Sequence, residues 1–142
     1  MTEFCVLHIR SNTCNELPAD FLKEGEGVEI FFEDNESSER RASFERLAKK
    51  GIFKRDGLPR YHWSYSSDGS IKSFDVYEHV AWIFDQFRPG FLLLQLQDIG
   101  FECLLQFYWE SNGTGAGPLV TPKVAELLER HNVGLQFGFY MK

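Results

Sequence analysis

Apolar and polar residues alternate over two stretches near the end of the chain, 101–109 and 133–140. In each stretch the odd-numbered residues are apolar and most even-numbered ones are polar or glycine, Leu104 being the clearest exception. This period of two predicts β-strands with one dry and one wetter face. Between them lies one helical apolar stripe, made of Val124, Leu127, Leu128 and His131. The pattern therefore predicts that this helix packs against the dry side of a sheet.

The rest of the chain predicts three more strands and further helices. The expected strands are 4–10, 28–32 and 61–66. The expected helices are 17–22, 38–50 with Ser38 or Ser43 as its cap, 73–88 with Ser73 as its cap, and 90–98. We therefore expect one α+β domain over residues 1–142. It is a two-layer sandwich in which helices cover one face of a mixed or mainly antiparallel sheet of about five strands. The alternation leaves the other face open to water or closed by a partner.

Charge narrows the classes of partner. The chain has 142 residues and a net charge of −6, which disfavours binding to nucleic acid or to an anionic membrane. The segment 41–60 is basic within this acidic chain and could serve as a partner surface, but a solvated helix face with its loop is the favoured interpretation. No apolar run is long enough to span a bilayer, and the start of the chain lacks the pattern of a signal peptide.

Cysteine usage is typical of a reducing compartment. The three cysteines, Cys5, Cys14 and Cys103, include no C-x-x-C pair, and Cys5 and Cys103 fall on apolar strand positions. We therefore expect free thiols and a cytoplasmic protein.

A glycine-rich loop is the first candidate binding element. Gly113, Gly115 and Gly117 precede a helix that opens at Thr121 and Pro122. Free amides at a helix start attract anions, and glycine lets a phosphate approach the backbone closely. The spacing matches neither a dinucleotide-binding fingerprint nor a P-loop, so a plain connection is the favoured interpretation.

The strand 61–66 is the second candidate. His62, Trp63, Ser64 and Ser66 put aromatic and hydroxyl groups where they could line a ligand site. His62 and the two serines share one strand face, but neighbours on that face are about 6–7 Å apart, too far for a base and its nucleophile. We predict no catalytic residues, no metal ligands and no cofactor.

Several features in order along the chain resemble a family of small bacterial domains. They are Leu17-Pro18-Ala19-Asp20, Lys50-Gly51, Trp63 followed by Ser66-Ser67, a long helix containing a Trp, a strand, a Gly-rich loop, Gly117-Pro118-Leu119, a helix and a last strand ending at Tyr140. The family is known only as a domain of unknown function, number four-two-seven-nine. The stretch 33–50 departs from it, being longer and more charged. The resemblance implies a cytosolic bacterial protein and transfers no activity or site residue.

Two functions from different classes follow. The first is a non-enzymatic binding protein, loosely similar to the immunity proteins of bacterial toxins, whose acidic surface meets a basic toxin domain. The second is a small-molecule or phosphate-binding domain, or an enzyme, that uses the strand 63–67 and the loop 113–117. The chain is expected to be a monomer, or a homodimer formed through the open sheet face or an edge strand.

Overall fold

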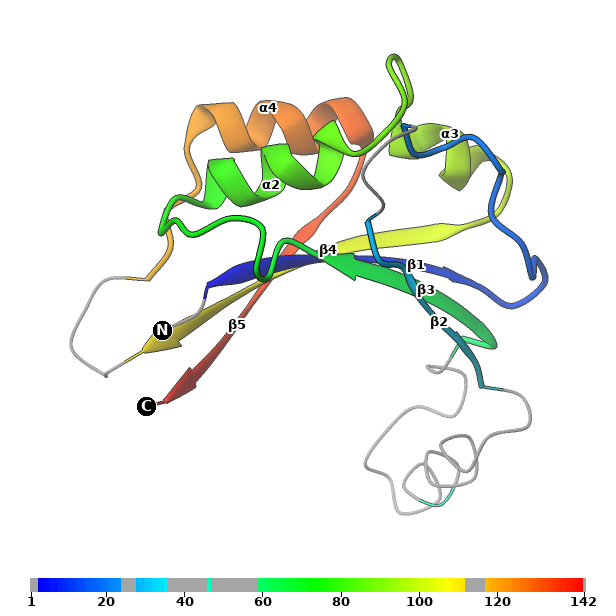
Figure 1. Cartoon of the computed structure of the whole chain (residues 1–142), viewed down its shortest axis with the longest axis horizontal. Helices are drawn as coiled ribbons and strands as arrows, with labels where there is room; N and C mark the ends of the chain where they lie inside the picture. Colours follow the sequence, from blue (N-terminus) through cyan, green and yellow to red (C-terminus); the bar gives the residue numbers. More distant parts are fainter. Residues whose placement is uncertain (1–2, 24–27, 36–45, 47–58, 112–116, 142) are drawn as a thin grey trace.

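Five strands form one open mixed sheet, with helices packed on one of its faces (Figure 1). The computed structural model describes residues 3–23, 28–35, 46, 59–111 and 117–141. The strand order is β2-β3-β1-β4-β5. The strands are β1 (Phe4–Ser11), β2 (Phe31–Asp34), β3 (Tyr61–Ser66), β4 (Glu102–Ser111) and β5 (Leu135–Met141). All neighbours run antiparallel except β4 and β5, which run parallel, so the predicted α+β architecture is confirmed.

The helices whose bounds the structure describes lie on one side of this sheet (Figure 1). They are α2 (Val76–Asp85), α3 (Leu93–Asp98) and α4 (Pro122–His131). Helix α4 begins as its sequence predicts, because the Thr121 hydroxyl accepts from the amide of Val124 and Pro122 occupies the first helical position. Asn132 ends it in the left-handed conformation, with φ 51°.

The core lies between the helices and one sheet face. Residues of β1 and β3 alternate between full and partial burial because successive side chains point to opposite faces, and the centre of β4 does the same at 104–108. The buried sheet positions are Cys5, Leu7, Ile9, Tyr61, Trp63, Tyr65, Leu105 and Phe107. On the helix side the core is completed mainly by Val76, Val80, Ile83, Phe84, Leu93, Leu96 and Val124. Burial raises the pKa of the Cys5 thiol to about 12, so Cys5 packs as a neutral apolar group.

A buried histidine joins the helix layer to the sheet. His79 of α2 has no exposed surface, and its Nδ1 lies 2.7 Å from Oγ of Ser67, directly after β3. The Cys5 amide donates to the same Oγ at 2.9 Å, and Nε2 of His79 lies 2.8 Å from the carbonyl oxygen of Ser73. A carbonyl only accepts, so Nε2 carries the proton and Nδ1 accepts from the Ser67 hydroxyl. Every polar atom in this chain of contacts is therefore satisfied.

Four local expectations were wrong. Residues 17–22 form no helix, because Phe21 enters the core beside Phe87 and Phe91 and the chain pairs in extended form with the end of α2 through the bridge between Leu22 and Phe87. Strand β2 begins at Phe31 rather than residue 28. Asp75, not Ser73, caps α2, which ends at Asp85. Helix α3 begins at Leu93 rather than residue 90. The expected helix 38–50 and most of the basic segment 41–60 lie outside the described residues.

Strand β5 is less buried than its alternation suggests. Phe137 contacts Phe107 and Phe139 contacts Trp109 on the helix-side face, as predicted. Yet their exposed fractions are 40% and 63%. The reason is position, because β5 is an edge strand and packs against only one neighbouring strand.

Candidate functional site

The sheet face opposite the helices carries the candidate site. None of the helices that the structure describes lies on this side (Figure 1). We call it the open face. The pairing register places there alternate residues of all five strands, with Glu33 beside His62, Ser64 beside His8, and Gln106 beside Gln136. The side chains are half-buried or exposed rather than fully buried. They include polar, aromatic and a few aliphatic groups.

A row of polar side chains crosses the open face from β2 to β5. Oε2 of Glu33 lies 3.7 Å from Nδ1 of His62, and Nε2 of His62 lies 2.8 Å from Nδ1 of His8. Nε2 of His8 lies 2.6 Å from Oε1 of Gln106, whose amide nitrogen donates to Gln136 at 2.9 Å. We call these five residues the polar row. Each strand of the sheet contributes one residue to it.

The contacts fix the proton positions on His8. Oε1 of Gln106 is an acceptor, so Nε2 of His8 carries a hydrogen and Nδ1 of the neutral ring accepts from Nε2 of His62. Burial, followed by the neighbouring His62, lowers the pKa of His8 to about 4. His8 is therefore neutral at pH 7. When His62 is protonated, its remaining N–H faces the Glu33 carboxylate.

An aromatic pair adjoins the polar row. The rings of Phe4 and Tyr108 stack with their centroids 5.1 Å apart, and the Tyr108 hydroxyl donates to Oε1 of Gln106 at 2.7 Å. The Tyr108 ring also covers Gly138 on the neighbouring strand, where a Cβ would approach two ring carbons to 2.9 Å. Glycine at 138 is thus what lets this ring lie flat on the sheet.

We expect Gly138→Ala to lower the free energy of unfolding by about 1 kcal/mol, because a methyl group forces Tyr108 off its stack and its hydrogen bond. Chemical denaturation measures this change. Gly134→Ala is the matched control, since no atom lies within 4 Å of a Cβ built there. Equal stability of the two variants would contradict the close approach.

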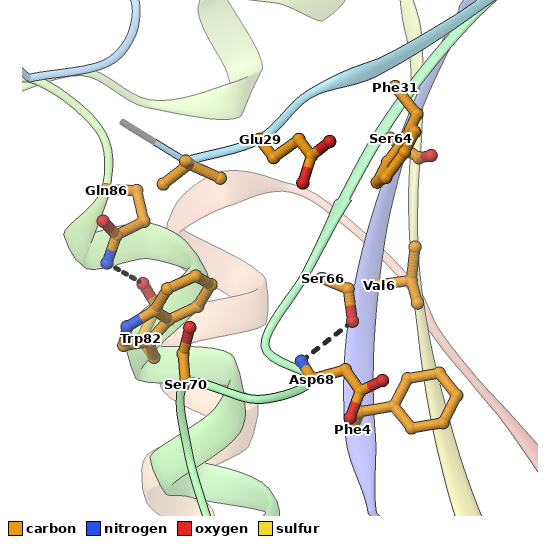
Figure 2. A pocket seen from close by; sticks show the side chains of 11 residues that line it. Phe4, Val6, Glu29, Phe31, Ser64, Ser66, Asp68, Ser70, Trp82 and Gln86 are labelled. Atoms are coloured by element: carbon orange, nitrogen blue, oxygen red, sulfur yellow. Dashed lines mark hydrogen bonds between the residues drawn. The ribbon is translucent and has the colours of Figure 1, made fainter. Parts of the chain in front are cut away.

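A groove opens at one end of the open face (Figure 2). The segment that leads into β2 diverges from β3 toward α2, and the space between them measures about 910 Å³. Phe4, Val6, Ser64 and Ser66 line it from the sheet, Phe31 and Glu29 from the β2 side, and Trp82 and Gln86 from α2. A groove of this size can hold an extended side chain or a small molecule.

The groove is acidic at its rim. The side chains of Glu29 and Asp68 both line it, from opposite sides, and both residues are exposed. The Ser66 hydroxyl accepts from the Asp68 amide at 2.9 Å, which holds the turn after β3 against the strand. Two carboxylates favour a cationic group in this groove and repel a phosphate.

The four residues expected on β3 separate onto two faces. Ser64 and Ser66 line the groove, and His62 lies beside them in the polar row. Trp63 points to the helix side and is 7% exposed, in edge-on contact with Phe101. His62 contacts His8, with 2.8 Å between its Nε2 and Nδ1 of His8. A ligand role for these residues stays a prediction.

The described end of the glycine-rich loop, Gly117, lies apart from this group. Gly113 and Gly115 lie outside the described residues. Gly117 lines a separate hollow of about 160 Å³ with Phe74 and Trp109. The Thr121 hydroxyl caps its own helix. The described parts of the loop and of β3 thus belong to two different hollows, and an anion site at the loop also stays a prediction.

The pair Ser67 and His79 has the spacing of a nucleophile and its base, yet neither residue has any exposed surface. A substrate cannot reach a hydroxyl that is sealed in the core, so this pair is structural. Within the described parts of the chain, no group of three or more His, Cys, Asp or Glu is arranged to hold a metal ion. Those same parts contain no helix both long and apolar enough to span a bilayer.

Residues that sequence reasoning missed make up most of the site. His8, Gln106, Tyr108, Glu29 and Asp68 come from segments far apart in the chain. Alternation assigned His8, Gln106 and Tyr108 to the wetter faces of their strands, and no comparable signal existed for Glu29 or Asp68. Strand order decides the rest, because β1 lies between β3 and β4.

Comparison with known proteins adds no relative: no family model, no curated protein and no solved structure matches the chain. The resemblance to the bacterial domain family therefore stays a prediction.

Proposed function

We propose that this protein is a non-enzymatic binding domain that docks a basic protein partner on its open face. The polar row carries this proposal. Its side chains are held in place by one another across the whole width of the sheet before any partner arrives. A surface ordered in advance loses little side-chain entropy on binding, which favours affinity.

The composition of the open face suits protein recognition. Phe4, Tyr108 and Phe31 offer aromatic contact area, and the polar row adds hydrogen-bonding groups between them. Aromatic anchors within polar surroundings are typical of protein interfaces. The carboxylates of Glu29 and Asp68 at the groove, together with the net charge of −6, favour a partner that presents lysine or arginine. An immunity-type complex with a basic toxin domain is one such partnership.

Charge reversal tests this proposal. The protein is immobilised and the proteins that it retains from an extract of its own organism, supplemented with the products of neighbouring genes, are quantified by mass spectrometry. We expect a specific basic partner whose retention falls at least tenfold in the double variant Glu29→Lys/Asp68→Lys and weakens as salt is added.

The matched control reverses two exposed acids on the helix side, Glu78→Lys/Glu129→Lys, which changes the net charge equally. This variant should retain the partner nearly as well as the unmodified protein. Equal loss in both double variants, or no retained partner at all, would exclude the open face as the docking surface.

The groove favours a second candidate, a small cationic ligand held between its aromatic side chains and its carboxylates. A thermal-shift screen of amines and guanidines tests it. A ligand at a hundredfold over its dissociation constant would stabilise the fold by about 2.7 kcal/mol. The shift should vanish in Val6→Trp, which fills the groove. No shift across the panel would exclude this candidate.

A further inference from the structure

The two edges of the sheet differ in how well they are protected against pairing. Strand β2 has four residues and ends in Glu33 and Asp34, and charges of this kind discourage the addition of another strand. Strand β5 has seven residues and contains no charged residue and no proline. Natural proteins seldom leave such an edge unprotected, because its backbone groups invite another strand. An edge of this composition indicates that something covers it.

The backbone groups of β5 point alternately inward and outward. Leu105 donates its amide to the carbonyl of Gly134 at 3.2 Å, which places Gly134 and every second residue after it toward β4. The N–H and C=O groups of Leu135, Phe137, Phe139 and Met141 therefore point away from the sheet. These outward groups are the ones that a further strand would pair with.

We propose that the protein forms a homodimer in which β5 pairs antiparallel with β5 of a second copy, about a two-fold axis at Gly138. In this register Phe137 of each copy lies opposite Phe139 of the other, and both are residues with outward backbone groups, so they form hydrogen-bonded pairs. Leu135 and Met141 pair in the same way. Gly138 of one copy lies opposite Gly138 of the other at the axis. This pair is not hydrogen-bonded, so the two strands approach closely there, and glycine has no side chain that would obstruct the approach.

Self-complementarity and charge favour a second copy as the occupant. Phe137 and Phe139 are 40% and 63% exposed on the helix-side face, and this register buries each against the other across the axis. Aromatic pairs directly across two strands are stabilising. Two copies that each carry a net charge of −6 repel one another. The β5 strand has no charged residue, so two copies that meet along this edge bring no carboxylates of β5 face to face. A two-fold contact is also closed, because the two β5 edges pair with each other and neither is left for a third copy.

Size measurements test the dimer. We expect light scattering on the unmodified protein at about 100 µM to give twice the 16.5 kDa of one chain. The variant Phe139→Lys should be monomeric, because it places a lysine on each strand of the paired edge. Phe31→Lys is the matched control, since it changes an equally exposed phenylalanine, 60% exposed, on the other edge strand. Added salt should strengthen the dimer, because it screens the repulsion between like-charged copies. A monomeric unmodified protein, or dimer loss in Phe31→Lys, would overturn the proposal.

Disulfide cross-linking tests the register. With the axis at Gly138, the double variant Phe137→Cys/Phe139→Cys should give a covalent dimer under mild oxidation, because paired Cα atoms are about 5.5 Å apart. Neither single variant should cross-link, since neither cysteine then faces a second one. A covalent dimer from a single variant would place the axis at that residue and overturn the register. This dimer involves the β5 edge and not the groove, so its failure leaves the open-face proposal unaffected.

Discussion

Replacing His79 with alanine is expected to lower the free energy of unfolding by about 4 kcal/mol. The ring packs edge-on against Phe107 with centroids 5.5 Å apart and has no exposed surface, so its removal leaves a cavity. The substitution also removes the acceptor of the Ser67 hydroxyl hydrogen and the donor to the Ser73 carbonyl, and a buried polar group that loses its partner costs about 1–3 kcal/mol. Chemical denaturation of the purified variant measures the loss.

Two further variants make this result specific. Glu78→Ala changes the exposed neighbour on the same helix and should stay within about 0.5 kcal/mol of the unmodified protein. Ser67→Ala combined with His79→Ala should cost less than the sum of the two single changes, because both remove the same hydrogen bond. Additive costs, or a His79→Ala variant as stable as Glu78→Ala, would contradict the link between sheet and helix.

Acid is expected to destabilise the fold between pH 6.5 and pH 4 through His8 and His131. Burial lowers the pKa of His131 to about 4, with Arg130 adding to the effect, and the pKa of His8 is also about 4. The His131 ring stacks on Phe84 at 3.8 Å, and its Nδ1 accepts from the Leu93 amide, so a proton on that atom breaks the bond between α4 and the start of α3.

The direction follows from which state binds the proton first. An unfolded histidine titrates near pH 6.5, so as the pH falls the unfolded chain gains protons that the folded protein excludes. The contribution of these two histidines to the free energy of unfolding is fully present above about pH 6.5 and is lost as the pH falls from 6.5 to 4. Below pH 4 they cause no further loss. After allowance for solvent screening, each histidine should cost about 1 kcal/mol between pH 7 and pH 5.

Denaturation curves at pH 7, 6 and 5 measure this slope. His131→Gln and His8→Gln should each remove about half of the decline in stability between pH 7 and pH 5. Each variant is compared with its own stability at pH 7, so a difference between the proteins at that pH does not affect the result. This window lies above the usual pKa values of carboxylates, which keeps most of them out of the measurement. A slope that neither variant changes would show that these histidines are not the source.

Much of the architecture could be predicted because a period of two or of 3.6 is imposed by the backbone itself. The alternation of Leu105, Phe107 and their neighbours identified β4 and its buried face. Residues 17–22 were predicted wrongly, because Phe21 gains more from the aromatic cluster with Phe87 and Phe91 than the segment gains from a short helix. The sequence of residues 17–22 alone does not predict this contact, because Phe87 and Phe91 lie more than 60 residues further along the chain.

Only the part of the candidate site that lies on β3 could be predicted as a ligand site from the sequence. Ser64 and Ser66 were identified as candidate lining residues, and they do line the groove. Alternation placed Gln106 on the wetter face of its strand, but its contact with His8 depends on strand pairing. The position of Asp68 depends on the turn after β3, and no local pattern encodes either arrangement. The outward-facing edge of β5 depends likewise on strand order.

The central place of β1 has a consequence for how the chain is made. The ribosome releases β1 before either of its neighbours in the sheet, because β3 and β4 both lie after residue 60. While the later segments are being translated, Cys5, Leu7 and Ile9 have no sheet to cover them and both backbone edges of the strand are vacant. Pairing between such distant segments is slow. Newly synthesised chains should therefore depend on chaperones more than chains of this length whose first strand lies at an edge.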